Sequence, residues 1–425
     1  MRLKLHWQIL IALALAVPLG RLAGTDSTLF GVNFHQVFAF VGTLFLNALK
    51  MLIVPLIISS IISGIAGIGT SSALGRLGGR TLLYYVTTSL LAILTGLLLV
   101  NLVAPGMING APAHDLLGLQ NNGESVAAKV AGHGGNDVIA VFLRMVPVNI
   151  VAAAADGQML GLIFFSLLYG YFMTRIGADY ADVQYNFWRG LFKVMMLMTE
   201  WVIRFAPIGV FALVAKVVAE TGFAAAEPLL LFFGTVLLAL AVHFFVTLPL
   251  LLRFVGRVNP WRHYRAMVPA LLTAFSTASS SATLPVTMEC VERNAGVSNR
   301  TSSFVLPLGA TVNMDGTALY ECVAAMFIAQ AYGLELSFSV QFTIVLIALL
   351  TSIGVAGIPS ASLVAIAIIL GSIGLPAEGI GLILAVDRVL DMCRTAVNVF
   401  SDSCGAVVIG RLDGEEGILA DPAKA

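Results

Sequence analysis

Long apolar stretches recur along the chain and strongly limit what it can fold into. A helix that crosses the hydrocarbon core of a membrane needs about 20 mostly apolar residues. Eight stretches meet this need: His6–Leu22, Phe38–Ile68, Leu82–Val103, Val138–Met173, Phe187–Val218, Pro228–Leu252, Phe304–Tyr332 and Ile380–Val408. Only 11% of the residues are charged, roughly half the share of a soluble domain. We therefore predict an all-α membrane protein with eight transmembrane helices.

Two further apolar stretches, Ala266–Val291 and Phe338–Ile373, are interrupted near their middles by small and hydroxyl residues. The interruptions are Ser276–Pro285 and Ser352–Ser362. Each half holds only about 10–14 residues, which suits a re-entrant hairpin better than a full span. Backbone groups freed at such a break need a polar cavity, because lipid cannot satisfy them. We expect two re-entrant helical hairpins.

The arginines and lysines between these segments fix an expected orientation. If eight helices span and both hairpins re-enter, the basic clusters beginning at Arg2, Arg76, Arg175, Arg253 and Arg293, and the C-terminal ones, fall on one side. The positive-inside rule then places both termini in the cytoplasm. We expect a multi-pass protein of the plasma membrane, the inner membrane in a bacterium.

The last apolar stretch contains a polar strip. On a helix, at about 100° per residue, six polar residues fall within roughly a 100° arc: Asp387, Asp391, Arg394, Thr395, Asn398 and Asp402. Charges inside a membrane are costly and usually mark a substrate or ion pathway. A buried structural salt bridge is the alternative, although it would need only two charges.

The last third also resembles an inverted repeat. A hairpin and an interrupted helix at Asn313–Thr317 precede a second hairpin and the polar helix. In transporters, such repeats place the site at the membrane midplane, between broken helices.

Several other functions find no support in the sequence. The formal net charge of 0 argues against a nucleic-acid partner. The four cysteines have no metal-binding spacing, and the chain lacks the P-loop motif of ATP-driven proteins. No pairing of a nucleophile with a base indicates an enzyme.

Four motifs occur in order: Ser279–Pro285, Asn313–Thr317, Gly354–Pro359 and Asp391–Asn398. Together they closely resemble the dicarboxylate/amino acid:cation symporter family, which includes excitatory amino acid transporters and bacterial glutamate/aspartate symporters. The resemblance covers the whole chain and implies an elevator-type homotrimer without an organic cofactor. The scaffold would comprise residues 1–75 and 138–222, and the transport domain residues 76–105 and 223–425, with an external loop at 106–137.

The resemblance also implies a substrate site for an acidic amino acid. Arg394 would bind the side-chain carboxylate and Asp391 the α-ammonium. The remaining residues would hold the α-carboxylate and ammonium or line the site: Ala278, Ser280, Thr317, Ile358, Ser362, Thr395 and Asn398.

Three sodium sites are implied in the same way. The first would use Gly309, Asn313, Asn398 and Asp402; the second Thr311, Ser352, Ile353 and Val355; the third Tyr85, Thr88, Ser89, Asn313 and Asp315. Oxygen-rich sets of this kind suit a hard cation. Glu321 is a candidate proton carrier, or else a partner for a buried arginine, so coupling to sodium, protons or both stays open.

The chain departs from the family at two arginine positions. Some members have an extra arginine at the position of Ala278 and others at that of Met392, which leaves potassium counter-transport in doubt. Several alternatives also remain: a C4-dicarboxylate carrier, in which Asp391 would lack an ammonium partner; a neutral amino-acid carrier, which would not need Arg394; and an anion-conducting channel.

Overall fold

The described part of the protein is mostly helical. The computed structural model describes residues 5–29, 32–68, 75–117, 119, 143, 145–156, 158–222, 224–354, 361–376 and 379–420. The elements of the first half are α1 (Leu5–Ala23), β1 (Thr28–Leu29), β2 (Val32–Asn33), α2 (Phe34–Ile68), α3 (Gly75–Val103), β3 (Met107–Ile108), β4 (Ala111–Pro112), α6 (Ile150–Ala155), α7 (Met159–Met173), α8 (Ala178–Ile203) and α9 (Ala206–Thr221). The strands form two antiparallel pairs, β1 with β2 and β3 with β4.

The second half holds the broken helices. Its elements are α10 (Ala226–Val242), the π-helical turn η2 (His243–Thr247), α11 (Leu248–Phe254), α12 (Pro260–Thr277), α13 (Ser280–Glu289), the π-helical turn η3 (Cys290–Asn294), α14 (Asn299–Val312), α15 (Asp315–Ala331), α16 (Phe338–Gly354), α17 (Ala361–Ser372) and α18 (Ile380–Leu412). The break predicted within Ser276–Pro285 is present between α12 and α13. The second lies between α16 and α17, and residues 355–360 at its centre are outside the described residues.

Besides Phe304–Tyr332, which the predicted interruption divides into α14 and α15, two predicted spans do not form single helices. For Val138–Met173, the structure has the short α6 and then α7, which begins only at Met159. The side chain of Asn149 accepts hydrogen bonds from the backbone of Val151 and Ala152 and thereby starts a separate helix. Residues 138–142, 144 and 157 lie outside the described part.

The second exception is Phe187–Val218. The chain bends by 54° between Ala178–Val202 and Ala206–Glu220. Pro207 stands in the first turn of α9 and has no backbone N–H to continue the hydrogen-bond ladder of α8. The apolar pattern continues through the junction of α8 and α9, so hydropathy does not predict the bend.

By length and composition, two described helices could cross a membrane, Leu77–Val103 and Ala226–Phe254. The bent pair α8–α9 would be a third if it forms one span. The count of eight spanning helices stays a prediction.

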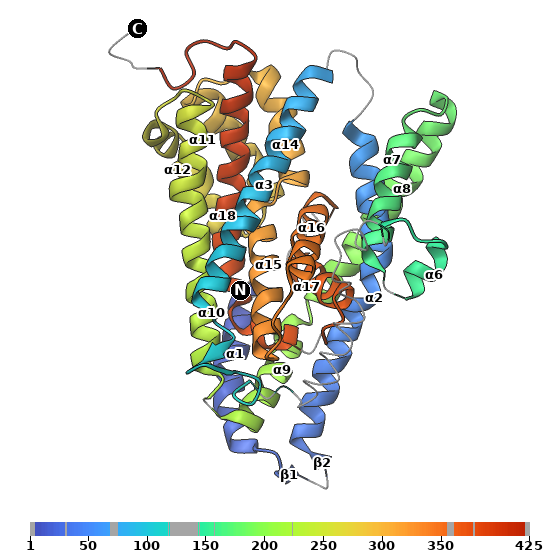
Figure 1. The fold of residues 1–425 in the computed structure, drawn as a ribbon, viewed down its shortest axis with the longest axis vertical. Coiled ribbons are helices and arrows are strands. Elements are labelled where there is room, and N and C mark those ends of the chain that lie inside the picture. Colours follow the sequence, from blue (N-terminus) through green and yellow to red (C-terminus); the bar gives the residue numbers. More distant parts are fainter. Residues whose placement is uncertain are drawn as a thin grey trace.

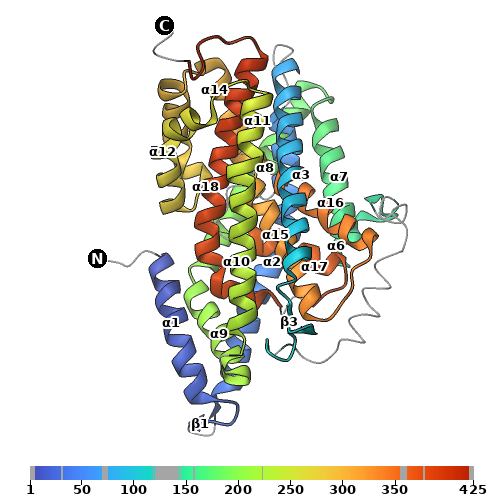
Figure 2. The ribbon, with the colours of Figure 1, turned by 60° about the vertical axis from the view of Figure 1, so that its left-hand side comes forward.

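The helices form two groups (Figures 1 and 2), which touch where α16 and α17 pack on α2 and α7 and where α18 packs on α9. In one group, α1 packs on α9, and α2 packs on α7, α8 and α9. In the other, α18 packs against α10, α12, α14 and α15, while α3 packs along α15. Helix α18, red in Figure 1, lies between α12 and α15.

Helix α15 lies in the centre of the fold. Every one of its residues except Gln330 is buried. Gly96 of α3 allows close contact, because a Cβ there would lie 3.0 Å from the side chains of Leu319 and Val323. Asp315, Thr317 and Glu321 are therefore polar groups in the interior of the protein, where they need partners or ligands.

The segment after α18 is fixed to the start of α14. The backbone N–H of Ser298 donates to Oε2 of Glu415 at 2.9 Å, and the hydroxyls of Ser298 and Thr301 donate to Oε1. A carboxylate at a helix N-terminus also interacts favourably with the helix dipole. Partial burial of Glu415 raises its pKa, but the bonds from Ser298 and Thr301 outweigh burial and hold the pKa below its ordinary value.

We expect Glu415→Gln to lower the free energy of unfolding by about 1 kcal/mol at neutral pH, after allowance for solvent screening. The folded protein has the lower pKa, so this stabilisation is present above the ordinary pKa of glutamate and is lost as pH falls through the folded value. Thermal unfolding in detergent at several pH values measures it, with the exposed neighbour Glu416→Gln as control. Equal stability of both variants at neutral pH would contradict the prediction.

Candidate functional site

The break between α14 and α15 lies beside the polar strip of α18. Asn313 leaves the helix with φ −103° and ψ 102°, and α15 begins two residues later. The freed N–H of Gly316 donates to Oδ1 of Asn398 at 2.8 Å, and Nδ2 of Asn398 donates to Oγ1 of Thr317 at 3.1 Å. A Cβ on Gly316 would lie 2.8 Å from the backbone oxygen of Arg394. Only glycine therefore permits this approach of the two helices.

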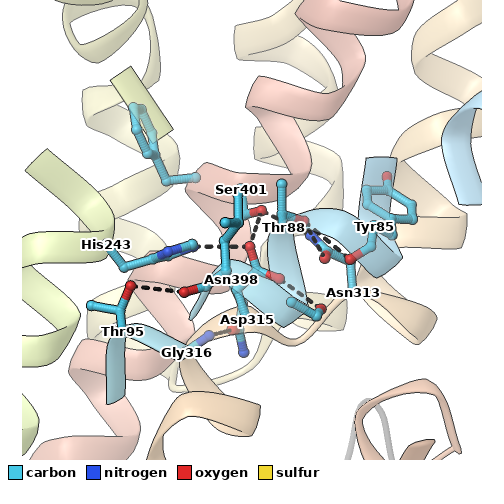
Figure 3. Close-up of polar contacts among 12 residues, drawn as sticks. Tyr85, Thr88, Thr95, His243, Asn313, Asp315, Gly316, Asn398 and Ser401 are labelled. Carbon is cyan, nitrogen blue, oxygen red and sulfur yellow. Dashed lines mark hydrogen bonds and ion pairs between the residues drawn. The ribbon is translucent and has the colours of Figure 1, made fainter. Parts of the chain in front are cut away.

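Asp315, at the first position of α15, receives hydrogen bonds from three helices (Figure 3). Ser89 of α3 donates to Oδ1 at 2.7 Å, and Ser401 of α18 donates to Oδ2 at 2.6 Å. Nε2 of His243, in the π-helical turn after α10, lies 3.1 Å from Oδ2. The carboxylate is fully buried, so its position is fixed from three directions.

Asn313 links this group to Asp402. Its Nδ2 donates to Oδ1 of Asp402 at 2.9 Å and to Oγ of Ser401 at 3.0 Å. Thr88 approaches the Oδ1 of Asn313 at 3.4 Å. Asp402 is buried, and no ion pair of Asp402 with Lys, Arg or His occurs within the described part of the chain.

Gly309 leaves room for oxygen atoms from two other helices. A Cβ at this position would lie 2.5 Å from both Oδ1 of Asp402 and the hydroxyl oxygen of Tyr85. The hydroxyl of Tyr85 donates to the backbone oxygen of Val305 at 2.8 Å. The structure thus brings together the residues of two implied ion sites: Gly309, Asn313, Asn398 and Asp402, and Tyr85, Thr88, Ser89, Asn313 and Asp315. Their carboxylate, amide and hydroxyl oxygens fit a hard monovalent cation.

The remaining implied ion set is not joined in the same way. Thr311 is exposed, and its hydroxyl donates to its own helix, to Leu308 O at 2.9 Å. Ser352 is buried and donates to Leu349 O at 2.7 Å. Ile353 lies in the last turn of α16, and Val355 lies outside the described residues. Among the described residues, no hydrogen bond connects Thr311 with Ser352.

Arg394 is buried on the polar strip. Its Nη2 lies 3.1 Å from Oδ1 of Asp387 and 3.0 Å from Oδ1 of Asp391. The guanidinium lies over the ring of Tyr320, 3.9 Å from its centroid. Nε and Nη1 are buried without a hydrogen-bond partner among the described residues. Unpaired buried donors are rare. Nε and Nη1 lie on different edges of the guanidinium, so each is available to a ligand oxygen, and a two-bond contact with a carboxylate would also use Nη2.

Asp391 is held by two arginines. Its Oδ1 pairs with Arg394, and its Oδ2 lies 3.2 Å from Nη1 of Arg388. Asp391 therefore has partners in this structure without a substrate ammonium, so its presence does not exclude a substrate that lacks an amine. Thr395, also on the strip, is buried, and its hydroxyl donates to the backbone oxygen of Asp391 at 2.8 Å.

The hairpins contribute small residues near breaks. Ala278 ends α12 in the left-handed conformation, with φ 50° and ψ 41°. Ser280, the first residue of α13, is buried, and α13 packs against α18. Ser362 of α17 is buried, and its hydroxyl has no partner among the described residues. Ile358 lies outside those residues.

Glu321 is one turn beyond Thr317 on α15 and is buried. Thr351 of α16 donates to its Oε2 at 3.0 Å. No salt bridge joins Glu321 to an arginine among the described residues, and the close partners of Arg394 are Asp387 and Asp391.

Several groups of this site were not predicted from the sequence. His243 is a single histidine in an apolar stretch, and the π-helical turn that holds it has no sequence signature, although such turns occur often at functional sites. Ser401 lies at the edge of the polar strip, next to Asp402, so its position in the sequence could have indicated a role in the site. Asp387 was on the strip but was not assigned to the site.

Comparison with known proteins gives concordant matches. A profile described as the sodium:dicarboxylate symporter family matches residues 5–412. The chain is 36% identical to the proton/glutamate-aspartate symporter of Escherichia coli (strain K12) over 413 residues, 96% of this chain and 93% of that protein. It is 34% identical to the proton/sodium-glutamate symport protein of Geobacillus stearothermophilus, over 97% and 96% of the two chains. It is 36% identical to mouse excitatory amino acid transporter 3, over 97% and 87%.

Proposed function

Because the chain belongs to the sodium:dicarboxylate symporter family, we propose that it takes up glutamate and aspartate by symport with sodium ions, protons or both. Members of this family are membrane transporters rather than enzymes. The observation that carries the proposal is the buried guanidinium of Arg394, with two free donors, beside the carboxylate of Asp391. The pair offers a cation for a side-chain carboxylate and an anion for an ammonium.

In this proposal, Arg394 binds the side-chain carboxylate of the substrate through two parallel hydrogen bonds. Asp391 binds the α-ammonium. Asn398, Thr395 and the backbone at the two hairpin tips hold the α-carboxylate, and Thr317 and Ser362 line the site. At the tip of the first hairpin, the N–H of Ala278 donates to the backbone oxygen of Ala274, so the part that would favour an anion is the N-terminus of α13 at Ser280.

The coupling ions would bind beside the substrate. Asp315 and Asp402 are buried carboxylates with hydroxyl and amide neighbours, and sodium would neutralise them. In this proposal Asn398 is a ligand of the substrate and of the first sodium site; in the structure its Oδ1 accepts from Gly316 and its Nδ2 donates to Thr317. A cation at Asp402 would therefore be connected to the substrate through a single side chain. Glu321 would accept a proton if the carrier uses one.

The domain assignment is also part of the proposal. We infer that α1, α2, α7, α8 and α9 form a fixed scaffold and that α3 and α10 to α18 form a mobile transport domain. The packing of α2 on α7, α8 and α9, and of α18 on α10, α12 and α14, supports two bodies. The protein would be a homotrimer of the inner membrane, with both termini in the cytoplasm, and would work by an elevator motion.

Two variants distinguish the coupling ions in reconstituted liposomes. If sodium drives uptake, Asp402→Asn should raise the sodium concentration for half-maximal aspartate uptake at least about tenfold, because it removes a charged ligand. Glu321→Gln should then mainly flatten the pH dependence. If a proton alone drives uptake, transport should persist without sodium under an inward pH gradient, and Glu321→Gln should stop it. An unchanged sodium requirement in Asp402→Asn would contradict the assignment of this site.

A further inference from the structure

We propose that Arg388 is a second guanidinium of the substrate site, and that it competes with the substrate's ammonium for Asp391. It would thereby set the preference between acidic amino acids and dicarboxylates without an amine. This inference rests on the proposed function and assigns a specificity-determining role that the polar strip alone does not indicate.

Asp391 is contacted by both arginines. Its two oxygens have different partners: Oδ1 lies 3.0 Å from Nη2 of Arg394, and Oδ2 lies 3.2 Å from Nη1 of Arg388. An incoming ammonium needs at least one of these oxygens. Arg394 releases Oδ1 when it turns its donors to the substrate's carboxylate, but Arg388 keeps Oδ2.

Arg388 is largely shielded from solvent. Its side chain is 17% exposed and that of Asp391 14%, so solvent screens their attraction only weakly. Nε of Arg388 is buried and has no hydrogen-bond partner among the described residues. A purely structural arginine would be expected to use that donor. A free donor beside the site suits a substrate oxygen instead.

Arg388 also changes the net charge of the polar strip. Asp387 and Asp391 carry two negative charges, and Arg394 alone would leave the strip with one in excess. With Arg388 included, the net charge of these four side chains is zero. A neutral cluster tolerates a dicarboxylate such as succinate, which brings no ammonium to replace the arginine. A cluster with excess negative charge would favour an amine-bearing substrate and repel a dianion.

The test compares succinate with aspartate in reconstituted liposomes. The quantity is the ratio of the inhibition constant of unlabelled succinate to the KM of radiolabelled aspartate, which does not depend on the amount of folded protein. In wild type, succinate should inhibit aspartate uptake. Arg388→Gln should raise the ratio at least about tenfold, because aspartate binds more tightly and succinate more weakly.

A matched control is Arg293→Gln. Arg293 pairs with Glu289 at 2.9 Å one helical turn away, but both side chains are largely exposed, and the ratio should stay as in wild type. If Arg388→Gln gives no folded protein, the same ratio is measured on Arg388→Lys. A single ammonium group pairs less well than a guanidinium, so the ratio should rise by about threefold.

An unchanged or lower ratio in the folded Arg388 variant overturns the inference while leaving acidic amino-acid transport intact. Wild-type protein that transports neither aspartate nor glutamate overturns the proposed function, and this inference with it.

Discussion

Replacing Arg394 by cysteine should abolish the uptake of glutamate and aspartate, with a loss in kcat/KM of at least about 10³-fold. The substitution removes two charge-assisted hydrogen bonds to the substrate's carboxylate at a buried position, about 4 kcal/mol or more. Uptake of serine or alanine is expected to appear, because the space left by the guanidinium no longer demands a charged substrate. Radiolabelled uptake into liposomes measures both effects.

Two companion variants separate charge from geometry. Arg394→Lys keeps the charge but cannot form two parallel bonds, so it should also be severely impaired. Arg394→Cys leaves Asp387 without its partner at 3.1 Å, and the double variant Asp387→Asn/Arg394→Cys removes that unpaired charge. The double variant should restore folding if the single one is unstable, without restoring glutamate uptake. Glutamate transport at the wild-type rate in either would disprove the role of Arg394.

Asp391→Asn should lower the affinity for glutamate by about 10²–10³-fold. It preserves size but removes the negative partner of the ammonium, and loss of one member of a buried ion pair costs roughly 3–5 kcal/mol. Competition by a dicarboxylate without an amine should weaken much less. Inhibition constants for unlabelled glutamate and succinate, measured on the same preparation, give the comparison.

Asp413→Asn serves as the control for loss of a carboxylate that pairs with arginine. Asp413 lies after α18 and pairs with Arg80 at 3.3 Å, where both side chains are partly exposed, so substrate affinity should be unchanged. Equal losses for glutamate and succinate in Asp391→Asn would show that Asp391 does not contact the ammonium.

Much of the architecture follows from hydropathy and small-residue breaks. The interruption at Ala278 and Ser279 was predicted because serine, threonine and proline cluster within an apolar stretch. The bend before Pro207 and the new helix start at Asn149 were not, since the apolar pattern continues around both. A single proline or capping residue changes the course of a helix without changing average hydropathy.

The site, too, could be predicted from the sequence only in part. The polar strip predicted that Asp391, Arg394 and Asn398 share one face of α18, because helical periodicity fixes which residues of one helix lie together. It could not predict contacts between helices. The hydrogen bond of His243 to Asp315 depends on a π-helical turn, and the pairing of Arg388 with Asp391 was one of several possible choices for that arginine.

The most direct test of the account is whether the protein concentrates aspartate. Purified wild-type protein in liposomes is given radiolabelled aspartate, with an inward sodium gradient, with an inward pH gradient in sodium-free buffer, or with neither. We predict that internal aspartate rises above the external concentration under at least one gradient, falls back when an ionophore dissipates it, and does not rise in Arg394→Cys. Aspartate that merely equilibrates, whatever gradient is imposed, would contradict symport and indicate a channel.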